Sequence, residues 1–600
     1  MKKINYLLLF FLSSLFLTGL MTSCSEDILD RPPLTSVNDN PETWKNPAMY
    51  ELYMNDYLAS YFSGFPDVGG EFSDDVVREG RQSNFNRSVP TSAIWGMANI
   101  RAFNLFLERI EAYGKDAVDP QVYNHWQGVG RFFRGLQYSY HVTTYGDIPW
   151  YDHVVSDTDM DDLYKARDPR NMVMNNVYED WVFALGNVNN TAPNQKINRD
   201  VVATVISRQA LREGTWQKYY YKNNEQATKF LKLAEEAAGM VINSGRYAIT
   251  TSYRELFTSN NLIGNKEVIL ARIYNIESGI RHSAGHYSNP RNTLALGGNT
   301  ALIKSYIAVD GKAYQNSGVA NVKSFAMEDL IKTRDSRFEG AFYARSIPQA
   351  KGSYLFPVKY MAREIVKILE DGKDLPAEWD GVAQVTDFPE LRYSEVLLNW
   401  IEAKAELATL GAGNAVTQTD IDNSINLIRN RPLHSDAEAR GASKTAPLSI
   451  AELPNDPDRD PTVSPLIWEI RRERRMEFAF EGMRYADLKR WSKLEYMDTM
   501  KNPDLLSGAW VNFPRDYSGS INADIGVVTV DGVYKPFQNN ANEMVGFFRH
   551  TKTEDRLQFL GLPNVNPYLS PIGTTQMDRY ADKGYVLDQT EGWPKYSPSN

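Results

Sequence analysis

Three loop segments of the chain bring aromatic rings together with planar polar side chains. An aromatic ring offers a flat apolar face, and arginine, asparagine and aspartate can each pair with two neighbouring hydroxyl groups. A sugar ring presents both kinds of surface. For each residue taken alone, ordinary packing within its loop is a sufficient explanation. For the group, we expect some residues of the loops at 78–86, 279–292 and 378–381 to contact a saccharide. The candidates are Arg81, Asn84 and Phe85, then Arg281, His286, Tyr287, Asn289 and Arg291, and finally Trp379 and Asp380.

A zinc site has one starting point in the sequence. His282 and His286 are four residues apart, a spacing that suits zinc when both lie on one helix. Gly279, Ser283 and Gly285 disfavour a helix there, and no third ligand is evident. Zinc is therefore not expected.

Aspartates alternate in two further segments, as they do at the start of a calcium-binding loop. These are residues 157, 159 and 161, and residues 456, 458 and 460. The first lacks the glycine and the distal glutamate of an EF-hand, and prolines interrupt the second. A structural calcium site therefore stays an open alternative, and no other cofactor is expected.

Catalytic motifs give little support for an enzyme. The sequence contains no phosphate-binding Walker pattern and no Gly-x-Ser-x-Gly elbow. A glycoside hydrolase needs only two carboxylates at a set distance, and the chain has 75 Asp and Glu residues. That class stays as an alternative to a binding protein.

The N-terminus has the pattern of a lipoprotein signal peptide over residues 1–23. Lys2 and Lys3 precede a largely apolar stretch, and a small residue stands directly before Cys24. Cys24 is the only cysteine, so neither a disulfide framework nor a cysteine-based metal site can form. We expect cleavage before Cys24 and acylation of its thiol, which would anchor the protein to a membrane.

Composition describes an ordinary globular protein after this segment. Of the 600 residues, 42% are hydrophobic and 23% charged. No later stretch has the roughly 18 apolar residues that a spanning helix needs. A formal net charge of −10 argues against nucleic acid as a partner, because that binding needs a basic surface.

Apolar periodicity predicts helical pairs separated by irregular segments. In residues 227–242 the apolar side chains follow helical spacing, with Asn223 as the cap and Gly245 at the end. The predicted helices are 128–144, 170–185, 201–219, 227–242, 391–410, 420–430 and 466–491. They group into pairs near 122–190, 200–245, 391–431 and 466–491. Two long excursions, 64–92 and 250–390, separate them, with a strand-like piece at 267–272.

Several motifs make the resemblance to a known family specific. They are residues 131–138 (RFFRGLQY) running into 145–149 (YGDIP), 392–403 (RYSEVLLNWIEA), 425–431 (INLIRNR), 471–491 (RRERRMEFAFEGMRYADLKRW), 568–572 (YLSPI) and 591–593 (EGW). Their content and order resemble the SusD/RagB family of nutrient-binding lipoproteins. The resemblance runs from Cys24 to the C-terminus.

The resemblance implies a mostly α-helical fold, with about four tetratricopeptide-like helix pairs, large loop excursions and a few short strands, in a single domain over residues 24–600. It also implies an outer-membrane lipoprotein that faces the exterior and binds glycans without catalysis. Its partner would be a TonB-dependent SusC-like transporter. A peptide-binding lid and a helical adaptor that contacts only proteins are further alternatives.

The charged residues of the motifs are expected to support the fold and not the ligand. Five charged residues would lie on one helix, where opposite charges three or four residues apart can pair: Glu473, Arg474, Arg475, Glu477 and Arg484. Arg392, Glu395, Glu402 and Arg429 would pair across a helical hairpin.

Overall fold

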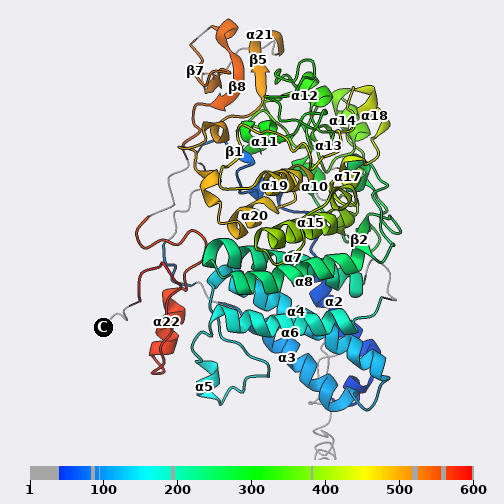
Figure 1. Ribbon diagram of the computed structural model, residues 1–600, viewed down its shortest axis with the longest axis vertical. Coiled ribbons are helices and arrows are strands. Elements are labelled where there is room, and N and C mark those ends of the chain that lie inside the picture. Colours follow the sequence, from blue (N-terminus) through cyan, green and yellow to red (C-terminus); the bar gives the residue numbers. More distant parts are fainter. Residues whose placement is uncertain are drawn as a thin grey trace, which may run out of the picture.

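The computed structural model describes residues 40–80, 82, 88–92, 95–190, 196–379, 381, 383–516, 524–538, 540–555 and 562–596. The fold is mostly α-helical with a few short strands, as the sequence predicts. Figure 1 shows an elongated molecule, with stacked long helices in its lower half and short helices, loops and strands in its upper half. The predicted signal peptide, residues 1–23, and Cys24 lie outside the described residues.

The long helices form a stack in which successive helices contact one another (Figure 1). Contacts run from α3 to α4, from α4 to α6, and on through α7, α8 and α15 to α19. The bounds are α2 Pro47–Tyr61, α3 Ala98–Arg109, α4 Pro120–Tyr145, α6 Arg170–Asn187, α7 Arg199–Trp216, α8 Asn224–Ile242, α15 Tyr393–Thr409 and α19 Pro465–Glu477.

Local sequence explains where these helices begin. Asn223 accepts a hydrogen bond from the backbone N–H of Gln226 at 3.1 Å, which confirms the predicted cap of α8. Helix α4 begins earlier than predicted because Asp119 caps it and Pro120 occupies the first helical turn. Helix α7 continues into a π-helical turn, Gln217–Tyr221.

The predicted helix 466–491 is wrong as a continuous element. Helix α19 ends at Glu477 and α20 covers Arg484–Arg490. Between them, Phe480 has a φ of 61°, which a continuous helix does not permit. The buried Lys359 ammonium donates to the carbonyl of Ala479, and Tyr360 donates to that of Phe480. These tertiary hydrogen bonds satisfy carbonyl groups that a helix would otherwise use.

The predicted helix 420–430 is likewise divided. Helix α16 covers Gln418–Asp422 and α17 covers Ile425–Arg429. Ser424 has a φ of −137° and a ψ of −91°, and its hydroxyl donates to the carbonyl of Asp420 at 2.6 Å. A serine hydroxyl that competes for a backbone carbonyl in this way favours a break.

Strands join the excursions to each other and to the helical stack. Strand β1 (Val76–Arg78) pairs with β3 (Leu296–Gly298), with Val77 opposite Gly297. Strand β2 (Val268–Arg272), close to the predicted piece, pairs with β4 (Phe388–Arg392), which leads directly into α15. A four-stranded sheet has the order β5–β8–β6–β7, with bounds Trp510–Asn512, Val545–His550, Ile525–Val528 and Tyr534–Pro536.

The remaining α-helices are short, apart from two of eight residues. They are α5 Met160–Leu163, α9 Tyr253–Thr258, α10 Ala284–Tyr287, α11 Thr300–Ser305, α12 Met327–Thr333, α13 Arg337–Ala341, α14 Arg363–Glu370, α18 Ser435–Ala439, α21 Phe513–Asp516 and α22 Thr574–Ala581. One large hydrophobic cluster fills the helical stack and another lies among the excursions and the sheet.

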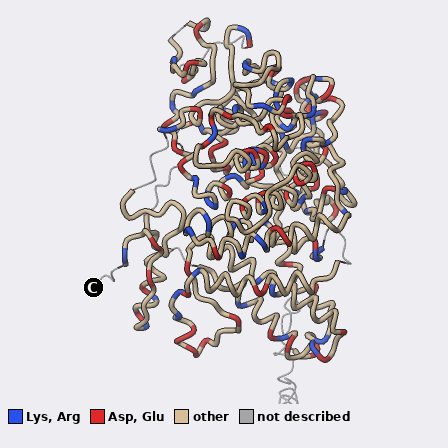
Figure 2. Tube along the Cα trace, in the orientation of Figure 1, with Lys and Arg blue, Asp and Glu red and all other residues tan. Residues whose placement is uncertain are grey.

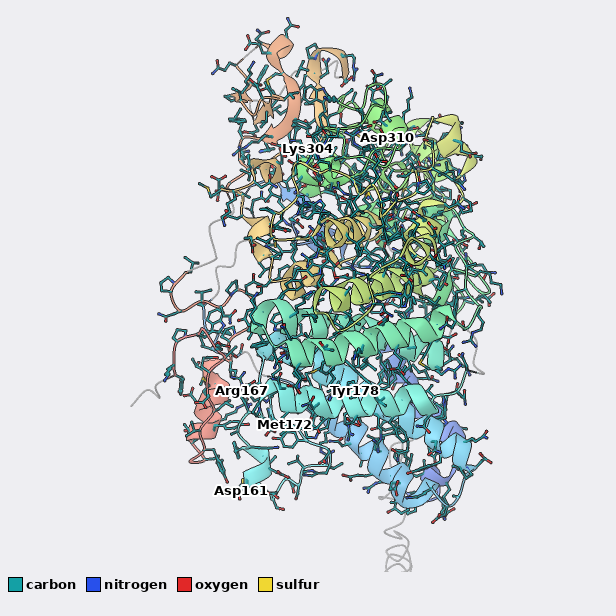
Figure 3. The ribbon with its side chains drawn as sticks, viewed as in Figure 1. Asp161, Arg167, Met172, Tyr178, Lys304 and Asp310 are labelled. Atoms are coloured by element: carbon teal, nitrogen blue, oxygen red, sulfur yellow. The ribbon has the colours of Figure 1, made fainter. Side chains whose placement is uncertain are left out.

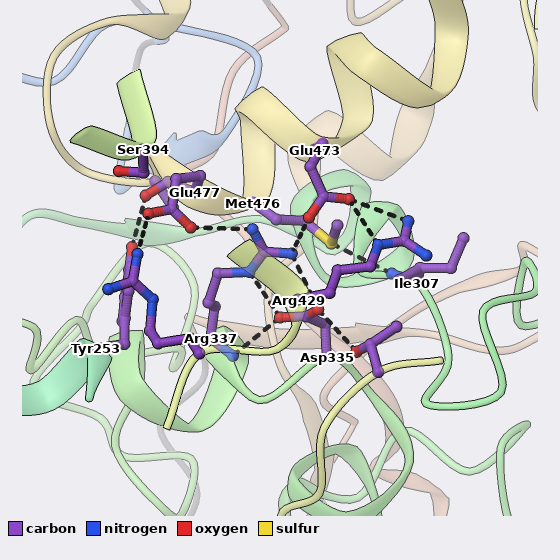
Figure 4. Close-up of polar contacts among 12 residues, drawn as sticks. Tyr253, Ile307, Asp335, Arg337, Ser394, Arg429, Glu473, Met476 and Glu477 are labelled. Atoms are coloured by element: carbon purple, nitrogen blue, oxygen red, sulfur yellow. Dashed lines mark hydrogen bonds and ion pairs between the residues drawn. The ribbon is translucent and has the colours of Figure 1, made fainter. Parts of the chain in front are cut away.

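A buried ionic network connects these two regions. Figure 2 shows positive and negative residues interleaved around α15, α19 and α20. In Figure 4, Arg337 Nη1 lies 3.0 Å from Glu477 and Arg337 Nη2 lies 2.6 Å from Glu473, while Arg429 also pairs with Glu473. Glu477 further pairs with Arg392. The partners therefore come from distant segments, and the expected pairing along one helix is not the arrangement that forms.

The helices of the structure can be compared with those that span a membrane. Within the described part of the chain, no helix combines the length and the apolar character that crossing a bilayer requires.

Candidate ligand-binding site

The second and third predicted loops lie against each other. His282 and Gln384 form a backbone bridge, and Gln384 Oε1 accepts a 2.6 Å hydrogen bond from the backbone N–H of Gly285. Gln384 Nε2 donates to the carbonyl of Trp379 at 3.2 Å. Helix α10 also contacts the short helical turn at residues 68–70, so part of the first excursion joins the same surface.

The predicted residues of the second loop differ in their exposure. Arg281 and His286 are exposed, and Tyr287 is half-buried. Asn289 is buried, and its Oδ1 accepts from the backbone N–H of Arg291 at 2.9 Å. Arg291 Nη2 donates to a backbone carbonyl of α14 at 2.6 Å. Asn289 and Arg291 thus shape the loop, whereas the first three side chains stay available to a ligand.

Trp379 does not offer the exposed ring that its polar surroundings suggest. It is 8% exposed and belongs to a small hydrophobic cluster with Leu294, Val366 and Leu369. Burial of the indole stabilises the turn Ala377–Trp379 against α14. The prediction of a stacking surface at Trp379 is therefore wrong. Arg81, Asn84, Phe85 and Asp380 lie outside the described residues.

The two histidines of the considered zinc site are engaged separately. His282 stacks on Phe65 with ring centroids 4.1 Å apart, and burial lowers its pKa to about 4. His286 Nδ1 lies 3.0 Å from Asn292 Nδ2. Within the described segments, no group of three metal-ligating side chains is placed to hold an ion.

A cavity of about 680 Å³ lies along α19, in a place that the sequence does not single out. Its wall comes from α11, the loop 456–461, α19, α20 and two short 3₁₀ turns, Leu494–Met497 and Pro503–Leu506. We call it the α19 cavity. Its volume is within the range of small-molecule sites. Three half-buried aromatic residues line it: Tyr314, Trp468 and Tyr496.

Two aspartates fix two of these rings. Asp456 Oδ2 accepts from Trp468 Nε1 at 2.6 Å, and Asp460 Oδ2 accepts from the Tyr496 hydroxyl at 2.6 Å. The two rings are arranged edge to face with centroids 6.5 Å apart. Burial would raise the pKa of Asp460, but hydrogen bonds from Lys493 and Tyr496 outweigh it and hold the pKa below its ordinary value. The carboxylate is thus charged and fixed at neutral pH.

These contacts give the alternating aspartates a role other than calcium binding. Asp456 pairs with Arg472, and Asp460 with Lys493 at 2.7 Å. The other alternating set lies near α5, at the opposite end of the view from Lys304 of the cavity (Figure 3). There Asp159 caps α5, and Asp161 accepts from the Tyr585 hydroxyl at 2.6 Å.

A second cavity, of about 610 Å³, lies between α3, the segment 151–163 and α22. Trp95 lines it but is only 6% exposed, and its ring is edge-to-face with Tyr145. Helix α3 begins at Ala98, three residues after Trp95. This burial makes Trp95 a packing residue.

Sequence reasoning missed the aromatic residues of the α19 cavity for a physical reason. Trp468 lies in a helix with apolar periodicity and Tyr496 in a segment without a motif, so both resemble core residues. The one available signal was the alternation of Asp456, Asp458 and Asp460 shortly before α19, which matched a calcium loop more closely than a support for aromatic rings.

Comparison with known proteins identifies the fold. The model of the SusD family matches residues 303–593. The SusD-like protein P2 of Formosa agariphila is 25% identical over 417 residues, covering 66% of this chain and 70% of that protein. A SusD-like carbohydrate-binding protein of Bacteroides fragilis superposes with a TM-score of 0.59 at 17% identity, covering 89% of this chain and 98% of that structure. A SusD superfamily protein of Bacteroides vulgatus gives 0.54 at 16% identity, covering 92% and 100%.

The fold is therefore that of the SusD-like proteins, a helical stack that carries large loop excursions. Residues 303–593 thus resemble the SusD family, and the described chain has the SusD-like fold.

Proposed function

We propose that this protein is an outer-membrane lipoprotein, anchored through Cys24 and facing the exterior, that binds nutrient glycans and delivers them to a TonB-dependent SusC-like transporter. It performs no chemistry on the glycan. The resemblance to the SusD family and the carbohydrate-binding relative support the binding role. The lipoprotein pattern at the N-terminus supports the anchor.

The fixed rings of the α19 cavity are the observation that carries the proposal. A sugar loses little affinity to side-chain ordering when its stacking surfaces are already held, as Trp468 and Tyr496 are by Asp456 and Asp460. The same wall carries donors, such as Lys304, and carboxylate acceptors. This combination serves both the faces and the hydroxyl groups of a saccharide. The exposed Arg281, His286 and half-buried Tyr287 offer a second, shallower surface.

The carboxylates of the cavity support binding over hydrolysis. A glycoside hydrolase needs two carboxyl groups free to exchange a proton or attack the sugar. Here Asp456 pairs with Arg472, Asp460 with Lys493, and Asp504 with Lys304 at 2.7 Å. Paired carboxylates of this kind stay charged and are poor proton donors. Asp458 alone among the cavity carboxylates has no basic partner in the described structure, and one free carboxyl group does not make the pair that hydrolysis needs.

Affinity electrophoresis tests the proposal. The full chain, solubilised in mild detergent, is run through gels that contain a panel of polysaccharides. We expect one polymer class to retard it and the Trp468→Ala and Tyr496→Ala variants to lose most of that retardation. Trp400→Ala, a half-buried indole on α15 outside the cavity, is the matched control. If no polysaccharide retards the protein but peptides bind it, the peptide-binding alternative replaces the proposal.

The anchor and the partner need separate measurements. A Cys24→Ala variant is expected to leave the membrane fraction, and the native protein is expected to co-purify from membranes with a large outer-membrane transporter. Purification without such a transporter would contradict the delivery role and leave the binding role intact.

A further inference from the structure

We propose that the α19 cavity selects saccharides that carry a negative charge, as a carboxylate or a sulfate group. The inference rests on the proposed function, because it assumes that this cavity binds the glycan. It concerns the charge of the ligand, which the proposed function leaves open.

Most charges on the cavity wall cancel in pairs. Arg484 binds both carboxylate oxygens of Asp74 at 2.7 and 2.8 Å, and Arg475 lies 2.6 Å from Asp75. Asp456, Asp460 and Asp504 have the basic partners described above. These pairs contribute little net field within the cavity.

Arg471 is the main exception. Its side chain is 4% exposed, yet Nε, Nη1 and Nη2 form no hydrogen bond in the described structure. The nearest carboxylate, Glu406, is 3.5 Å away and already pairs with Lys218 and accepts from Tyr219. The guanidinium lies 4.4 Å from the Trp491 ring centroid, under the cavity wall. Because solvent does not reach its nitrogen atoms, it acts on a ligand through its charge.

Arg334 adds a second buried guanidinium, behind the aromatic wall. It is fully buried, and its guanidinium lies 5.2 Å from the Tyr314 ring centroid. Nε and Nη2 form no hydrogen bond, and no described carboxylate pairs with it. Burial lowers the pKa of Arg334 to about 10, so the group is still protonated at neutral pH.

Two basic residues at the mouth can reach a ligand directly. Lys501 is exposed, and Arg459 is half-buried and donates to the carbonyl groups of Asp460 and Val463. Neither forms an ion pair with a carboxylate in the described part of the chain. The opposing charge is Asp458, which accepts from Gln315 at 2.7 Å and is exposed to screening by solvent. Glu495 also lines the cavity and shares Lys493 with Asp460, at 3.1 Å. Four basic groups without a dedicated carboxylate thus stand against two acids, Asp458 and Glu495.

Collisional quenching measures the sign of this field without knowledge of the ligand. Trp468 lines the cavity, and its fluorescence is obtained as the difference between the full chain and the Trp468→Phe variant. We expect the ratio of the iodide to the caesium quenching constant of this component, at matched ionic strength, to be at least threefold higher than the same ratio for free N-acetyltryptophanamide. A ratio equal to or below that of the free compound would overturn the proposal.

Charge variants at the mouth assign the effect to the cavity. Lys501→Gln should lower the iodide preference about twofold, and Asp458→Asn should raise it. Lys323→Gln changes an exposed lysine outside the cavity and should leave it unchanged. A preference that responds equally to Lys323→Gln and Lys501→Gln would place the field elsewhere and overturn the proposal.

Matched saccharides separate this inference from the proposed function. The probes are oligogalacturonate with its methyl ester, and chondroitin sulfate fragments with their unsulfated form. We expect the charged member of at least one pair to bind tenfold or more tightly than its neutral form. Preferential binding of the neutral forms, or of neutral saccharides only, would overturn the charge selectivity and leave glycan binding intact. Binding of no saccharide, charged or neutral, would overturn both.

Discussion

The indole Nε1 of Trp468 donates a 2.6 Å hydrogen bond to Asp456 Oδ2, and the same carboxylate is paired with Arg472. The orientation of the ring is therefore fixed by a carboxylate that Arg472 of α19 holds in place. A platform fixed in this way should contribute to affinity through both its area and its orientation.

Trp468→Phe keeps an aromatic face but removes the hydrogen bond. We expect the variant to bind the glycan up to about 10-fold more weakly, since ordering a freed side chain on binding costs about 0.5–1.5 kcal/mol. Trp468→Ala should lose more, because the stacking surface disappears. Titration calorimetry measures both, and equal affinities for Trp468→Phe and the unaltered protein would show that ring orientation does not matter.

Trp379→Ala is expected to act on stability and not on affinity. Its indole is 8% exposed within a hydrophobic cluster, so truncation should lower the free energy of unfolding by about 3 kcal/mol. Denaturant titration measures the loss, and calorimetry on the folded fraction checks the affinity. A weaker affinity with unchanged stability would restore Trp379 to the ligand site.

The sequence predicts the helical stack far better than the site. The cap at Asn223 locates the start of α8 and apolar periodicity its last turn near residue 242, because local interactions decide that helix. The break between α19 and α20 was not predictable locally, since Lys359, more than 100 residues away, provides the contact with the carbonyl of Ala479. The α19 cavity depends on segments near 304, 314, 456 and 496, and no short-range pattern shows that these converge.

Glu477→Gln should be strongly destabilising. The Glu477 carboxylate pairs with Arg337, Arg392 and Arg431 in a fully buried position, and loss of its charge leaves three guanidinium groups poorly compensated. We expect a loss of about 3–5 kcal/mol in the free energy of unfolding. The control Glu452→Gln, at an exposed position, should change it by less than about 0.5 kcal/mol. A small effect at Glu477 would mean that the network is not required for the fold.

Acid should unfold the protein through its paired carboxylates. Burial would raise the pKa of Asp74, but Arg475 and Arg484 outweigh it and lower the pKa to about 2. Arginines likewise hold the pKa of Glu477 below its ordinary value against burial. Because the folded-state pKa values are depressed, this stability is present above about pH 4 and is lost as the pH falls toward 2. Thermal melts from pH 6 to pH 2 measure it, and an unchanged Tm down to pH 2 would contradict it.

Glu390 should have the opposite pH dependence. Its carboxylate accepts from the backbone N–H of Gly64 at 3.0 Å, and burial raises its pKa to about 7. A raised carboxyl pKa costs stability as the pH rises from about 4.5 to 7, because the unfolded chain loses the proton first. The Tm of Glu390→Gln, relative to that of the unaltered protein, should therefore be higher at pH 8 than at pH 5. The same difference in Tm at both pH values would contradict the shift.

Hydrogen exchange of the full chain, with and without the glycan that retards it in gels, tests the location of the binding site most directly. The α19 cavity predicts that added glycan slows exchange in residues 456–468 and 494–502, and that Trp468→Ala abolishes this protection. Protection confined to residues 279–292 and 375–384, with the cavity segments unchanged, would contradict the account and place the glycan on the exposed loops instead.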